Sequence, residues 1–102
     1  MIPTMSSDSD RQRELKLKAL DGYRSEIDKF DKDIIEALGE RMKVVDKIAG
    51  LKKGEGEFEI EDKEREKEVC ENWHRLAGYK NLSGEFVGKI LDIVFSYSKS
   101  RQ

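Results

Sequence analysis

The sequence lacks the features that mark secreted, membrane-spanning and nucleic-acid-binding proteins. It has one cysteine, so it has no internal disulfide framework, which fits a reducing cytosol. Its apolar runs fall well short of the ~20 residues that span a bilayer, and residues 1–8 lack the basic start and apolar stretch of a signal peptide. The 20 Lys and Arg residues are offset by 22 Asp and Glu residues, which argues against neutralising a nucleic-acid backbone. We expect a soluble, cytoplasmic protein that binds neither membrane nor nucleic acid.

Helix-breaking residues are scarce as well. The one proline is Pro3, and no strand-like alternation of apolar and polar residues competes with a helical period. Apolar residues instead recur at steps of three and four, which predicts amphipathic helices and an all-α fold. The stripe of the first predicted helix, over residues 10–52, comprises Leu15, Leu20, Tyr23, Ile27, Phe30, Ile34, Leu38, Val45 and Ile48.

Two shorter helices are predicted after a glycine-containing loop at residues 54–58. The second begins near Ile60 and ends within residues 77–81, where Gly78 is a natural C-cap residue. The third begins after the N-cap Ser83. Its apolar stripe comprises Val87, Ile90, Leu91, Val94 and Tyr97. We therefore predict one all-helical domain over residues 10–102, preceded by a disordered segment at residues 1–9.

The first predicted helix is too long for the rest of the chain to cover. At 1.5 Å per residue it measures ~64 Å, whereas a compact chain of this size has a radius of gyration of only ~13 Å. A second copy of the chain is the simplest cover for its apolar stripe. The alternative is a helical hairpin that breaks near Gly39.

Charged residues occupy positions on these stripes that should be apolar. Arg41 lies seven residues after Ile34 on the stripe that contains Ile27 and Ile34. Lys52 likewise lies seven residues after Val45. At ~100° per residue, Arg41 and Lys52 lie within about 20° on one face. Buried charges are costly unless they are paired, so this placement suggests a site.

The other helices carry polar residues in the same way. Arg24 lies ~26 Å from Arg41 along the first helix and points to another side, so the two can share a small site only across a dimer. Asp62, Arg65 and Glu66 precede Val69 on the second stripe, and Ser98 and Gln102 continue the third. This set suits a pocket for a small dianion that carries a hydroxyl group. The pattern alone slightly favours the alternative, a network of surface ion pairs worth about 0–1 kcal/mol each.

The polar positions belong to segments with a distinctive order. These segments are residues 23–28 (YRSEID), 34–41 (IIEALGER), 48–52 (IAGLK) and 60–66 (IEDKERE), followed by Ser98 and Gln102. From Leu20 to Gln102, the pattern resembles the all-helical (type II) chorismate mutases. The resemblance implies three helices per chain and an intertwined homodimer, which would bury the stripe of the long first helix.

The resemblance also implies how a small dianionic substrate, chorismate, would be held. Arg41, Lys52 and Arg65 of one chain, with Arg24 from the partner chain, would bind its two carboxylates, and Ser98 would hydrogen-bond one of them. The fixed fork of arginine donors suits carboxylates, which explains arginine at three of these positions.

The remaining implied residues concern the reaction itself. Glu66, with Asp62 nearby, would accept a hydrogen bond from the ring hydroxyl, and Lys52 and Gln102 would donate to the ether oxygen. The implied reaction is the [3,3] rearrangement of chorismate to prephenate in phenylalanine and tyrosine biosynthesis. It needs no cofactor and no metal.

Other functions remain open at this stage. An isochorismate-pyruvate lyase shares the fold and the cationic clamp. The other alternative is a non-catalytic dimeric helical module, which would need no such clamp. Glu66, Cys70 and His74 lie on one helical ridge and could mimic metal ligands or a Cys–His pair, but we interpret their spacing as incidental.

Overall fold

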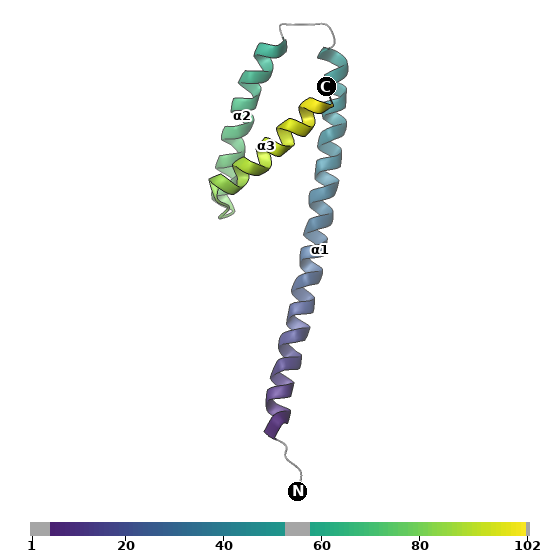
Figure 1. Ribbon diagram of the computed structural model, residues 1–102, viewed down its shortest axis with the longest axis vertical. Helices are drawn as coiled ribbons and strands as arrows, with labels where there is room; N and C mark the ends of the chain where they lie inside the picture. The colour runs from purple at the N-terminus through teal and green to yellow at the C-terminus, as the bar shows by residue number, and fades with distance from the viewer. Residues whose placement is uncertain (1–4, 53–57, 102) are drawn as a thin grey trace. The chain divides into compact units, whose positions relative to one another are not determined.

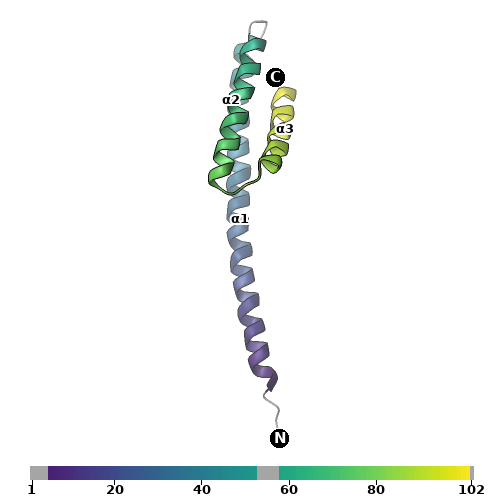
Figure 2. The same ribbon diagram turned by 90° about the vertical axis from the view of Figure 1, so that its left-hand side faces the viewer.

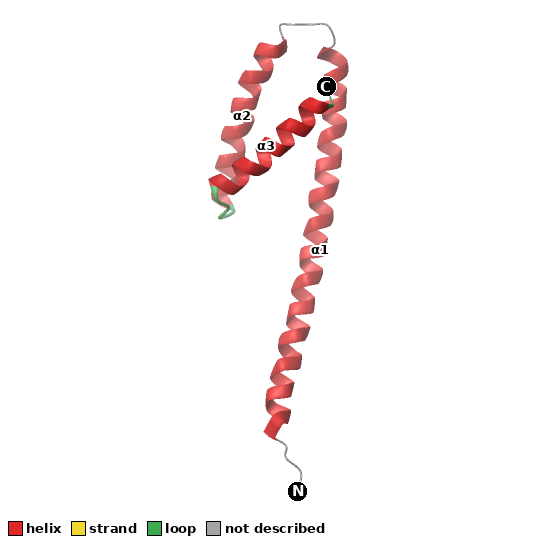
Figure 3. Ribbon diagram, in the orientation of Figure 1, coloured by secondary structure: helices red, strands yellow, loops and turns green. Residues whose placement is uncertain are grey.

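The computed structural model describes residues 5–52 and 58–101 (Figure 1). Three helices make up these ranges: α1 spans Met5–Lys52, α2 spans Phe58–Tyr79 and α3 spans Gly84–Ser100. Within them no strand occurs (Figure 3), which confirms the predicted all-α class with three helices. No helix of the described ranges is both long and apolar enough to cross a membrane.

Helix α1 continues without a break through Gly22, Gly39 and Gly50. The alternative of a hairpin broken near Gly39 is therefore wrong. The helix also begins at Met5, earlier than the predicted start at residue 10. Asp8 lies in its first turn, where a negative charge interacts favourably with the helix dipole. Helix α2 likewise begins two residues before the predicted Ile60.

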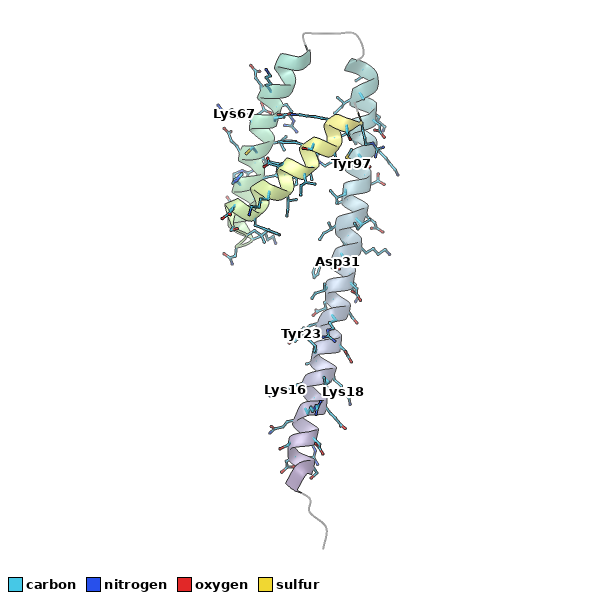
Figure 4. The ribbon with its side chains drawn as sticks, in the orientation of Figure 1. Lys16, Lys18, Tyr23, Asp31, Lys67 and Tyr97 are labelled. Atoms are coloured by element: carbon cyan, nitrogen blue, oxygen red, sulfur yellow. The ribbon has the colours of Figure 1, made fainter. Side chains whose placement is uncertain are left out.

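The chain divides into two compact units, Met1–Glu40 and Arg41–Gln102. In the first unit the described residues form only the N-terminal part of α1, from which Tyr23 projects (Figure 4). Large apolar side chains along it are exposed, from 37% for Leu38 to 67% for Ile35. The exposed residues are Leu15, Leu17, Leu20, Tyr23, Ile27, Phe30, Ile34, Ile35 and Leu38. The predicted stripe thus exists and is uncovered among the described residues.

The second unit contains the core, which the end of α1 forms together with α2 and α3. Helix α3 runs obliquely from the end of α2 toward residues 41–52 (Figure 1), and Figure 2 shows it lying to one side of both. The core side chains come from all three helices: Met42, Val45, Ala77, Val87, Leu91 and Val94. These residues include much of the predicted third stripe, whose period therefore correctly identifies the buried face of α3.

The connection between α2 and α3 uses an asparagine where the sequence suggests a glycine. Gly78 lies inside α2, which continues to Tyr79, so the prediction of Gly78 as the capping residue is wrong. Asn81 instead takes the left-handed conformation, with φ of 57°. The Leu82 N–H then donates to the Ala77 carbonyl at 3.0 Å, which closes the helix end in a Schellman-type turn.

Ser83 caps α3, as the sequence predicts. Its extended backbone precedes the helix, and its Oγ accepts a hydrogen bond from the Phe86 N–H at 3.1 Å. A serine in this position satisfies one of the N–H groups that lack a partner within the helix. The cap fixes where α3 begins and so sets the register of the residues that face the other two helices.

An ion pair fastens the far end of α3 to α1. Arg101 donates to both carboxylate oxygens of Asp46, through Nε at 3.0 Å and through Nη2. The hydrogen bond to Asp46, and then that to the Tyr97 hydroxyl, raises the pKa of Arg101 above its ordinary value. Tyr97, at the end of α3 in Figure 4, is 54% exposed, so it supports Arg101 rather than filling the core as its stripe position suggests.

Candidate active site

A cavity of about 710 Å³ opens in the second unit, between the end of α1 and the two shorter helices. Part of its wall is apolar, and every helix contributes to that part. The apolar lining consists of Val44, Val45, Ile48, Val69 and Phe95. A wall of this kind suits the carbon skeleton of a small organic ligand, because small-molecule sites combine apolar walls with a few placed polar groups.

The polar part of the lining is mostly cationic. It consists of Arg41, Lys63, Arg65, Glu66, Ser98 and Lys99. Four of these side chains are positive and one is negative at neutral pH. A cleft lined by charges of one sign concentrates ligands of the opposite sign. The cavity is therefore suited to an anion that carries more than one negative charge.

Arg41 and Ser98, both predicted site residues, meet in this cavity. The Arg41 Nη1 group donates to the Ser98 Oγ at 3.2 Å, although 57 residues separate them. The Ser98 side chain is buried, and its hydroxyl donates to the Val94 carbonyl at 2.8 Å. Because a guanidinium has five N–H donors, Arg41 can bond to Ser98 and to a carboxylate of a ligand. Ser98 thus orients the arginine toward the cavity.

Glu66 and Arg65 are the predicted site residues that α2 brings to the cavity. The Glu66 side chain is 33% exposed, and its Oε1 pairs with the Lys99 Nζ at 2.9 Å. Arg65 pairs with Glu68, one turn along α2, at 3.1 Å between two well-exposed side chains. Exposed pairs of this kind contribute about 0–1 kcal/mol, so Arg65 can exchange Glu68 for a ligand carboxylate at little cost.

Of the other four predicted site residues, three have side chains outside the described residues, and one lies in the first unit. Lys52 and Asp62 belong to α1 and α2, but their side chains lie outside the described residues, as does all of Gln102. Arg24 belongs to the first unit, is exposed, and is not among the residues that line the cavity. Their roles stay predictions.

Lys63 and Lys99 line the cavity but were not expected from the sequence. Lys99 follows Ser98 directly and lies off the apolar stripe of α3, so the helical period gives no reason to select it. Its position follows from the way α3 crosses α2, which brings the lysine to Glu66. The one available signal was its adjacency to a predicted site residue.

Cys70 and His74 of the predicted ridge lie next to each other on α2, with 3.6 Å between Sγ and Nδ1. The His74 Nδ1 lies 2.8 Å from the Cys70 carbonyl oxygen, one turn back along α2. On the other side of the ring, a Cβ added at Gly84 would lie 3.2 Å from the His74 Cδ2. The His74 ring therefore lies next to the start of α3, although the side chain is exposed. The described residues contain no group of three His, Cys, Asp or Glu side chains suited to a metal ion.

Comparison with known proteins agrees with this arrangement. The family described as chorismate mutase type II matches residues 23–102. A bifunctional chorismate mutase/prephenate dehydratase of Buchnera aphidicola subsp. Acyrthosiphon pisum (strain APS) is 34% identical over 80 residues, which are 78% of this chain and 20% of that protein. The chain thus spans about a fifth of the length of this curated relative. No solved structure gives a significant match. Because the family match covers most of its length, the chain belongs to the type II chorismate mutase family.

Proposed function

We propose that the chain is a chorismate mutase, an isomerase that converts chorismate to prephenate by an intramolecular [3,3] rearrangement in phenylalanine and tyrosine biosynthesis. The observation that carries the proposal is the cavity of about 710 Å³ on which Arg41, Arg65, Glu66 and Ser98 converge. All four residues lie within the segment that matches the family. The reaction is unimolecular and uses no cofactor, so binding and electrostatics are the means by which the protein accelerates it.

The first contribution is to hold the substrate in a reactive shape. Arg41 and Arg65 bind the two carboxylates, with Lys52 and the partner's Arg24 completing the clamp. A ligand gripped at both carboxylates is restricted to the folded conformer in which the two reacting carbons approach each other. The Arg41–Ser98 hydrogen bond supports this role, because an arginine that is already oriented loses less entropy when it binds.

The second contribution is to stabilise the charge that develops as the ether bond breaks. Negative charge grows on the ether oxygen, where Lys52 and Gln102 donate hydrogen bonds. The spacing along the sequence supports this role, because a helix would put Lys52 three turns beyond Arg41 on nearly the same face. Glu66, with Asp62 nearby, accepts the hydrogen bond of the ring hydroxyl. Lys52, Gln102 and Glu66 are therefore the proposed catalytic residues.

We further propose that the protein is an intertwined homodimer in which the partner copy covers the exposed stripe of α1. The support is the row of large apolar side chains in the first unit, including Ile27, Phe30 and Ile34, each more than half exposed. Fully burying one such side chain contributes about 1.5–3 kcal/mol. The partner would also supply Arg24, which explains why an exposed arginine far along α1 belongs to the family's set of site residues.

The assay that tests the function uses purified chain and chorismate, with separate measurement of chorismate loss, prephenate and pyruvate. The proposal predicts that prephenate accumulates in equal amount to the chorismate consumed. Pyruvate release in a parallel assay with isochorismate as the substrate would favour an isochorismate-pyruvate lyase activity instead. Chorismate that is lost no faster than in buffer would favour a non-catalytic helical module.

Sedimentation equilibrium tests the dimer. The proposal predicts a mass twice the 11.8 kDa of one chain. Ile27→Glu places a charge in the stripe and should shift the mass toward that of a monomer, whereas Glu26→Gln, a substitution at the adjacent exposed position, should not. A monomeric wild-type chain at assay concentration would contradict the proposed shared site.

A further inference from the structure

Lys99 connects the candidate site to α2 in a way that the family resemblance does not suggest. Ser98 and Lys99 are consecutive on α3, so their side chains leave the helix ~100° apart. Ser98 meets Arg41 of α1, and Lys99 meets Glu66 of α2 with 2.9 Å between Nζ and Oε1. One turn of α3 therefore ties together the two other walls of the cavity.

The pair differs from the exposed ion pairs of the same unit. Lys89 and Glu85, one turn apart on α3, have side chains that are 74% and 80% exposed, whereas those of Lys99 and Glu66 are 63% and 33% exposed. Water and salt screen a partly enclosed pair less than an exposed one. The Lys99–Glu66 contact also joins two helices rather than neighbouring turns of one helix. It therefore fixes the position of the carboxylate relative to the cavity.

Glu66 needs such a partner because of its surroundings. It is the one acid among the described residues that line the cavity, and Arg41, Lys63 and Arg65 line it as well. Arginine binds a carboxylate more strongly than lysine does, with two parallel hydrogen bonds. A Glu66 carboxylate without a partner of its own would therefore turn to the arginines and occupy the place of a substrate carboxylate.

We propose that Lys99 is a positioning residue that acts through Glu66. By holding Oε1, it keeps the carboxylate away from the arginine clamp and leaves Oε2 to accept the hydroxyl hydrogen bond of the ligand. The inference rests on the proposed function for the identity of that ligand. Although the Lys99 side chain lines the cavity, the proposal gives it no contact with the substrate or with the reacting atoms.

The test measures kcat and KM for prephenate formation separately in the variant Lys99→Met, which keeps most of the side-chain length and removes the charge. KM should rise about tenfold, the effect of one charge-assisted hydrogen bond, with a smaller change in kcat. Lys99→Arg should restore most of the loss, because it keeps a cation in reach of Glu66. Lys89→Met on the same helix is the matched control and should leave both constants and Tm unchanged. A KM for Lys99→Met equal to that of this control would overturn the proposal.

A double-mutant cycle with Glu66→Gln separates positioning from direct binding. If Lys99 acts through Glu66, adding Lys99→Met to Glu66→Gln changes KM by less than about twofold. If the double variant instead shows the product of the two single increases in KM, Lys99 does not act through Glu66. An inactive wild-type chain would instead refute the proposed function, and the inference about Lys99 with it. If the wild type is active but the two substitutions raise KM independently, only the role of Lys99 is refuted.

Discussion

The hydroxyl group of Ser98 offers a sharp test of the site, because its removal separates a stability effect from a functional one. Ser98→Ala deletes the 2.8 Å bond to the Val94 carbonyl and the 3.2 Å bond from Arg41. The chain also provides a matched control. Ser100 lies on the same helix and donates to the Tyr97 carbonyl at 2.6 Å, but it is exposed and lies outside the cavity lining.

The expected loss of stability is small. A neutral hydrogen bond contributes a net ~1 kcal/mol, and alanine recovers about 0.5 kcal/mol through its higher helix propensity. Arg41 is only part-buried, so water can replace the hydroxyl at its guanidinium. The free energy of unfolding should therefore fall by only about 0.5 kcal/mol, the difference between the first two terms. The function should suffer more, because an arginine that has lost its orienting partner misplaces the substrate, which can reduce kcat/KM by about 10- to 100-fold.

Two measurements on each variant give the answer: urea unfolding at equal protein concentration, and kcat/KM for the conversion of chorismate to prephenate. Ser98→Ala should lose much activity and little stability, and Ser100→Ala should lose little of either. Activity of Ser98→Ala within twofold of wild type would refute the role given to the Arg41–Ser98 contact. A stability loss large enough to account for the lost activity would refute it as well.

Three other changes probe the core, the end of α3 and the dimer. Leu91→Ala, at a side chain only 2% exposed, should lower the free energy of unfolding by about 2–5 kcal/mol, and a loss under about 1 kcal/mol would contradict the packing of α3. Asp46→Asn should lower Tm by the same amount at about pH 7 and about pH 9. The pKa of Arg101 is raised in the folded state, so its ion pair with Asp46 stabilises the fold fully below the ordinary pKa of arginine and is lost only at strongly alkaline pH. A difference in Tm between wild type and Asp46→Asn that vanishes by about pH 9 would contradict this. Mixing Arg24→Ala with Arg41→Ala chains should restore activity that neither variant has alone, because one site of each mixed dimer is intact; no recovery would exclude a shared site.

Features that depend on the helical period could be predicted from the sequence. The period correctly identifies three helices, and the stripe of α3 correctly places Leu91, Val94 and Ser98 on its buried side. Ser83 was recognisable as a cap because the capping bond forms between residues only three positions apart. Arg41 and Ser98 are in contact, as expected for residues on the inward faces of their helices, but their roles in binding a ligand stay predictions.

Features that depend on how helices cross could not be predicted in this way. Glycine and asparagine both tolerate the left-handed conformation, so the choice of Asn81 over Gly78 follows from where α2 must end for α3 to pack. Lys99 lies off the stripe of its own helix and gains its partner, Glu66, only through the angle between α2 and α3. A periodic pattern describes the faces of one helix and does not predict the angle at which two helices cross.

The central claim is that the cavity in residues 41–102 is where chorismate becomes prephenate. The most direct test compares the rate of prephenate formation by the wild-type chain with that of Arg41→Ala, using Arg75→Ala on the exposed surface of α2 as the control for loss of an arginine. We predict a wild-type rate far above that in buffer, a large loss in Arg41→Ala, and an unchanged rate in Arg75→Ala, with equal helicity in all three proteins. An Arg41→Ala variant that forms prephenate as fast as the wild type would contradict the claim.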